Sequence, residues 1–174
     1  MGESASLKPL DAIVDAGAAP EEMAAVESVF RAANVPATVR DDYVRLSAEV
    51  LPFVVMFIAP VTWVAAKFAG GFAAKAREDA WDEYRSGGWR GLSRFITEIA
   101  AARQGRAGKT TIRDPTGPDL DLAYGIPDEA LQELAELDWD VMRNGDLGWD
   151  PVTGQWLFLH ATRAPRGLPP PRRH

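Results

Sequence analysis

The sequence has no cysteine and only two histidines among its 174 residues. The absence of cysteine excludes disulfides, zinc–thiolate sites and cysteine nucleophiles, and it is typical of a reducing compartment. His160 ends a predicted strand with no nucleophile or carboxylate beside it, and His174 lies in the C-terminal tail. Since a catalytic base needs such neighbours, the sequence leans away from an enzyme.

A secretory signal is also missing, because the N-terminal residues MGESASLKPLDAIV hold no basic start followed by an apolar stretch. Together with the lack of cysteine, this predicts a cytoplasmic location. The chain is rich in alanine, arginine and glycine, a composition that we take to be bacterial. Its apolar fraction of 47% is ordinary for a globular protein, so most of the chain is expected to fold as one domain.

Loops that bind phosphate or calcium are present only as fragments. Residues 105–111 read GRAGKTT, but the first glycine of a phosphate loop would stand at position 103, which is arginine. Aspartates precede and follow Met142, yet a calcium loop would need an oxygen donor at that position. We therefore expect no cofactor and no metal.

The one long apolar run, Leu51–Ala74, holds a single charge, Lys67, and a proline, Pro60. About 20 apolar residues can span a bilayer, but proline would kink such a helix and the lysine would cost roughly 2.5–3.5 kcal/mol to insert. The β-branched and aromatic residues of Phe53–Ile58 instead predict a buried strand. After the proline, helical spacing predicts an amphipathic helix to about Arg85.

The order of the predicted elements favours an α+β fold. We expect a single mixed or antiparallel sheet with helices packed on one face. A βαββα N-terminal part is compatible with a ferredoxin-like half, and a hairpin-helix-hairpin part follows. The organisation predicted is a loose leader at 1–9, a domain at 10–162 and a disordered Pro/Arg tail at 163–174. Within the domain we expect a βαββαα part at 10–104, a basic linker at 105–109 and the hairpin-helix-hairpin part at 110–162.

Charge is segregated along the chain. Residues 67–113 hold ten basic and five acidic side chains, whereas residues 114–150 hold eleven acidic side chains and one basic one. The simplest interpretation is that the basic helices dock near the acidic half and that both faces are solvated. The functional interpretation is a charged partner, or head-to-tail self-association through the opposite patches.

The segregated charge predicts an interaction surface rather than a catalytic site. Its candidate residues are Arg77, Arg85, Trp89, Arg90, Arg94, Asp138, Asp140 and Asp146. Basic residues interleaved with aromatics also suit single-stranded nucleic acid. Asp119 and Asp121 share one face of a predicted strand and could divide acid and base roles, but the alternation of a half-exposed strand explains them equally well.

These features favour a non-catalytic protein–protein interaction or accessory module of a bacterial cytoplasmic system, capable of self-association. One alternative is a membrane-associated protein that uses residues 51–74. Another is a nucleic-acid-binding domain that uses the basic helices at 75–109. A third is an enzyme with a carboxylate site, and the sequence predicts no particular small-molecule ligand.

Overall fold

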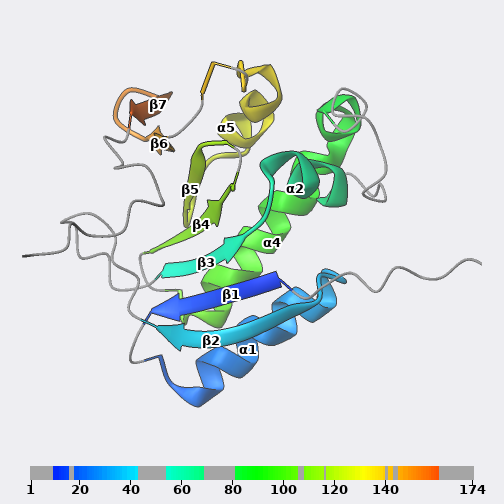
Figure 1. Ribbon diagram of the computed structural model, residues 1–174, viewed down its shortest axis with the longest axis vertical. Coiled ribbons are helices and arrows are strands. Elements are labelled where there is room, and N and C mark those ends of the chain that lie inside the picture. The colour runs from blue at the N-terminus through cyan, green and yellow to red at the C-terminus, as the bar shows by residue number, and fades with distance from the viewer. Residues whose placement is uncertain are drawn as a thin grey trace, which may run out of the picture.

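The computed structural model of the chain (Figure 1) describes residues 10–15, 18–42, 54–68, 81–105, 108–115, 117–139, 141–142 and 145–160. The predicted leader and tail lie outside these residues, and so do residues 69–80 of the predicted long helix.

The first elements are β1 (Leu10–Asp15), α1 (Pro20–Ala32) and β2 (Ala37–Asp42). Proline at the start of α1 and two glutamates in its first turn explain why the helix begins there. Asn34 follows the helix with a φ of 55°, a left-handed conformation that asparagine tolerates better than most residues. This residue turns the chain back towards β2.

The long apolar run divides at Pro60, as predicted, into β3 (Val54–Ile58) and α2 (Val61–Phe68). The backbone N–H of Val64 donates to the carbonyl of Pro60 at 3.1 Å, so the proline stands at the helix start, where its missing N–H costs little. Lys67 is only half-buried and reaches solvent. Within the described ranges, no helix has the length and apolar character that crossing a membrane requires.

A π-helical turn, η1 (Tyr84–Gly88), leads directly into α4 (Trp89–Ala102). Gly87 has a non-helical φ of 149°, a conformation that favours glycine. A Cβ at this position would also lie 3.0 Å from the guanidinium of Arg90. The predicted helix does not end at Arg85: the described helical segment continues through a kink at Gly87 into α4.

The remaining elements are β4 (Lys109–Arg113), β5 (Asp119–Ala123), α5 (Asp128–Glu133), the 3-10 helix η2 (Leu134–Glu136), β6 (Gly145–Asp150) and β7 (Gln155–His160). β4 and β5 pair antiparallel as a hairpin, and β6 and β7 do the same, as the predicted hairpin-helix-hairpin pattern requires. Trp149 and Trp156 lie opposite each other in the second hairpin, with ring centroids 5.7 Å apart. Lys109, the last residue of the predicted basic linker, is already part of the sheet.

All the described strands join one mixed sheet, which fans from β2 at the bottom of Figure 1 to β7 at the top, in the order β2-β1-β3-β4-β5-β6-β7. Parallel pairs (β1–β2, β3–β4 and β5–β6) alternate with antiparallel pairs (β1–β3, β4–β5 and β6–β7). The α+β class with a single mixed sheet is thus confirmed. β1 and β2 are direct neighbours, whereas a split βαβ unit inserts a strand between them, so the pairing does not support a ferredoxin-like half.

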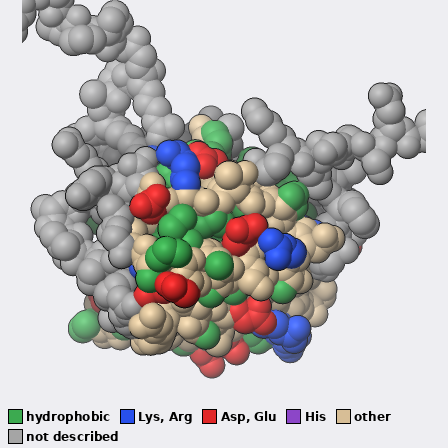
Figure 2. Space-filling model, turned by 90° about the horizontal axis from the view of Figure 1, so that it is seen from below, with side chains coloured by type: hydrophobic (Ala, Val, Ile, Leu, Met, Phe, Trp, Pro, Cys, Tyr) green, Lys and Arg blue, Asp and Glu red, His purple; other side chains and the backbone are tan. Residues whose placement is uncertain are grey.

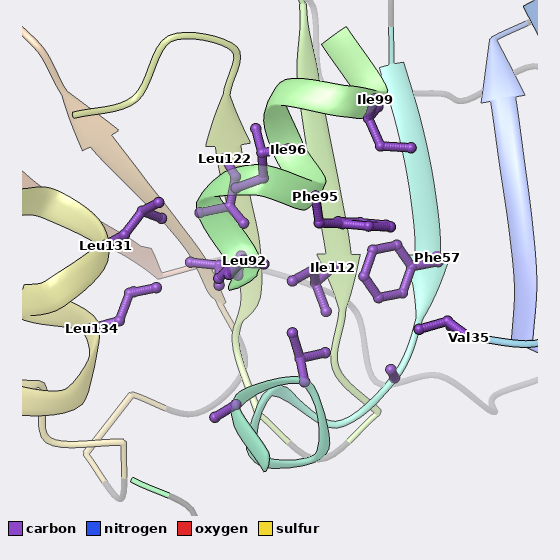
Figure 3. Close-up of a cluster of buried hydrophobic side chains, with 14 of the residues drawn as sticks. Val35, Phe57, Leu92, Phe95, Ile96, Ile99, Ile112, Leu122, Leu131 and Leu134 are labelled. Atoms are coloured by element: carbon purple, nitrogen blue, oxygen red, sulfur yellow. The ribbon is translucent and has the colours of Figure 1, made fainter. Parts of the chain in front are cut away.

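Successive strand residues point to opposite faces of the sheet. One face meets the described helices in a single apolar cluster, drawn in Figure 3, where side chains of α4 and α5 lie over those of β3, β4 and β5. The cluster includes Phe30, Val55, Phe57, Val64, Leu92, Phe95, Ile112, Leu120, Leu122, Leu131 and Leu147. The alternating residues point to the opposite face, called the far face below. It carries Asp11, Ile13, Met56, Lys109, Thr111, Arg113, Asp119, Asp121, Asp146, Leu157 and Leu159.

Candidate functional site

The residues predicted to form an interaction surface do not gather in one place. Arg77 and Asp140 lie outside the described residues. Arg94 is exposed on α4, on the helical side of the sheet, whereas Asp146 stands on the far face in β6. Asp138 is exposed after η2. The candidate residues that the structure describes therefore lie on two separate surfaces.

The side chain of Arg85 forms ion pairs with other residues of the same chain. Its guanidinium donates to Asp82 Oδ1 at 2.7 Å and to Glu136 Oε1 at 2.9 Å. Beside it, the guanidinium of Arg90 lies 4.6 Å from the ring centroid of Trp89. The ion pair with Glu136 joins the basic helical segment to the acidic half of the chain. A nucleic acid at this surface would have to compete with these contacts.

Asp119 and Asp121 do share the far face of β5, but cations of β4 accompany both carboxylates. Lys109 Nζ lies 2.6 Å from one oxygen of Asp121, and the hydroxyl of Thr111 donates to the other, also at 2.6 Å. Arg113 Nε lies 3.4 Å from Asp119 Oδ2. These contacts engage both carboxylates within the sheet.

A buried ionic cluster joins β1, α1 and the end of α4. The guanidinium of Arg103, which is fully buried, donates to Glu22 Oε2 at 2.6 Å and to Asp15 Oδ1 at 2.5 Å. The sequence does not reveal this cluster, because each residue resembles an ordinary charge at the end of a strand or helix. The only signal was that an arginine ended an apolar helix, and a sequence alone does not show which partners it reaches.

Tyr124 lies near this cluster, and we expect it to make the fold sensitive to alkali. Burial raises the pKa of Tyr124 to about 12, although the positive charge of Arg103 opposes the rise. An unfolded tyrosine ionises near pH 10. Between pH 10 and pH 12 the unfolded chain releases the phenol proton of Tyr124, whereas the native chain keeps it. The free energy of unfolding is therefore unaffected by this group below pH 10 and falls as the pH rises towards 12. Because the ring is only partly buried, we expect a loss of about 1–2 kcal/mol.

Urea unfolding of the wild type and of Tyr124→Phe at pH 9 and pH 11 measures this effect. The phenylalanine variant should lose less stability between the two values, since it has no phenol at position 124 to ionise. Burial also raises the pKa of Tyr84, whose hydroxyl donates to the carbonyl of Leu131 at 2.8 Å, so both proteins retain the contribution of that residue. An equal loss in the two proteins would refute the prediction.

The two edges of the described sheet differ in charge. β2 carries Arg40, Asp41 and Asp42, and Arg40 forms a bidentate ion pair with Asp11 of β1 at 3.0 Å. Charges on an edge strand discourage pairing with another strand. β7 reads QWLFLH, without an acidic or basic residue apart from the final histidine. It exposes 45% of Leu157 and 67% of Leu159.

A shallow hollow of about 390 Å³ lies beside the other edge, between α1 and β2. Its lining consists of Glu27, Arg31, Asn34, Val35, Pro36, Ala37 and Thr38. Figure 2, seen from this end of the molecule, shows apolar side chains interspersed with acidic and basic ones. Arg31 and Glu27 pair with each other at 2.9 Å and are largely exposed. The hollow therefore lacks the buried polar group that would orient a specific ligand.

Among the described residues, no three histidine, cysteine or acidic side chains lie close enough together to hold a metal ion. The strongest candidate for a binding site is thus the apolar β7 edge with the two leucines beside it. Compared with known proteins, the chain matches no protein-family model, no curated protein and no solved structure.

Proposed function

We propose that the protein is a non-catalytic protein–protein interaction module of a bacterial cytoplasmic system, and that β7 contacts its protein partner. The observation that supports this proposal is the uncharged β7 edge with Leu157 and Leu159 exposed on the far face. Among the residues that the structure describes, no strand pairs with the outer side of β7. An edge of this kind is a template for an added strand.

The position of β7 in the fold supports the same proposal. Trp156 and Phe158 pack against the apolar core, which holds the backbone of β7 in an extended conformation before any partner arrives. Such preorganisation lowers the entropy cost of binding. The intervening leucines then supply apolar area beside the main-chain groups of the edge. Affinity would come from the main-chain hydrogen bonds and specificity from the side chains that alternate along the strand.

Replacing both leucines by aspartate tests the proposal. The double variant Leu157→Asp/Leu159→Asp should weaken capture of a protein partner from an extract of the native cells at least tenfold, because it adds charge to the edge strand. The matched control is Val152→Asp, the same kind of change at the tip of the β6–β7 turn, where the side chain is 90% exposed. Equal capture by both variants and the wild type would refute the proposed role of β7.

A further inference from the structure

We infer that the partner of β7 is a second copy of this chain, whose own β7 pairs antiparallel with it in a register centred on Phe158. The inference rests on the proposed function and names the partner. The pairing of the two β7 strands would join the sheets of the two copies into one continuous sheet, with the copies related by a two-fold axis. Such an interface is isologous, since the same strand serves both copies.

The two faces of β7 limit the registers that a second copy can adopt. Trp156 and Phe158 point to the helical side and pack against the core, whereas Leu157 and Leu159 point to the far face. Residues directly opposite in an antiparallel pair have their side chains on the same face of the sheet. A continuous sheet therefore needs a register in which each leucine meets a leucine or another residue of the far face. Centring the pair on Phe158 satisfies this requirement.

In this register the far-face side chains of the two β7 strands complement each other. Leu157 lies opposite Leu159 of the second copy, and Leu159 lies opposite Leu157, so the leucines of both copies form one apolar cluster. On the helical side, Phe158 lies opposite its own symmetry mate, but its ring is turned over Gly145 of β6, so the leucines provide the side-chain contact across the seam. The register centred on Leu157 would instead place Leu159 opposite the polar Gln155, which is a poorer match.

The charge distribution permits this arrangement although the C-terminal half is acidic. The nearest acids on the far face are Asp146 and Asp150 of β6. In the dimer the two copies of β6 are separated by both copies of β7, which is three strand spacings or about 14 Å. This separation exceeds the Debye length of about 8 Å at physiological salt. Pairing of two β2 edges, in contrast, would bring the exposed Asp41 of each copy to the seam.

Sedimentation velocity of the purified chain from micromolar to millimolar concentration tests the dimer. The wild type should shift from monomer to dimer, whereas Leu157→Asp/Leu159→Asp should raise the dissociation constant at least about tenfold, because the carboxylates of both copies meet at the seam. Both leucines are exposed, so the monomer should keep its circular dichroism spectrum. Val152→Asp should associate as the wild type does. A wild type that stays monomeric, or a double variant that associates equally well, would overturn the inference.

The absence of native cysteine makes disulfide crosslinking a clean test of the register. Under mild oxidation, a mixture of Leu157→Cys and Leu159→Cys chains should crosslink faster than either variant alone, because opposite Cβ atoms lie about 4.5–5.5 Å apart and a disulfide needs about 3.5–4.5 Å. Val152→Cys should crosslink slowly. Leu157→Cys crosslinking best with itself would refute the register centred on Phe158.

Failure of this inference can be told apart from failure of the proposed function. A monomeric chain that binds a different protein, and loses it in Leu157→Asp/Leu159→Asp, would overturn only the second copy as partner. A chain that neither associates with itself nor binds another protein through β7 would overturn both.

Discussion

Replacing Arg103 with methionine is expected to destabilise the protein by about 3–5 kcal/mol. The guanidinium is fully buried and contacts both Glu22 and Asp15 within 2.6 Å. Methionine fills much of the same volume but leaves two carboxylates without their cation, and Glu22 is itself buried. The main cost is therefore the uncompensated buried charge rather than the attraction that is lost. Urea unfolding followed by circular dichroism measures the difference in free energy.

Two further variants separate charge from packing in this cluster. Arg94→Met makes the same substitution at an exposed site of α4 and should change stability by less than about 0.5 kcal/mol. Adding Glu22→Gln and Asp15→Asn to Arg103→Met should recover part of the loss, because neutral amides remove the stranded charges. A loss below about 1 kcal/mol for Arg103→Met would show that the cluster is not important for stability.

The elements that sequence patterns predicted well are those whose signals are local. Pro60 marks the end of β3 and the start of α2, and the turn residues between β6 and β7 mark a hairpin. Both features depend on backbone chemistry within a few residues. The parallel pairing of β3 with β4 and of β5 with β6 depends instead on how helices return the chain to the sheet. Local sequence patterns contain little information about such long-range neighbours.

The candidate site shows the same division. The sequence predicts a strand that ends at His160 and so includes Leu157 and Leu159. It does not show that this strand is an edge, because edges are defined only by the order of the whole sheet. The charge pattern drew attention to Arg85, whose partner Glu136 lies 51 residues away in the chain. Arg103 was the reverse case, since its charge suggested a surface residue and tertiary packing made it a buried one.

Truncating Phe95 to alanine is the other change for which we expect a loss of about 3–5 kcal/mol. Phe95 is buried at the centre of an aromatic group that joins α1, β3, α2 and α4. Its ring centroid lies 5.2 Å from that of Phe30, 6.1 Å from that of Phe57 and 5.1 Å from that of Phe68. Truncation removes all three ring contacts and leaves a cavity that the sheet on one side can fill only in part.

Phe68→Ala provides the matched control, because it removes the same atoms from a half-buried ring at the rim of the same group. It should cost about half as much as Phe95→Ala, since less apolar surface returns to water and solvent can fill the space. Chemical denaturation of both variants and of Phe95→Leu, which keeps most of the volume, measures the order. We expect Phe95→Ala to be the least stable and Phe95→Leu to be more stable than Phe95→Ala. If Phe68→Ala were the more damaging truncation, the centre of the core would lie nearer α2 than the packing of Phe95 implies.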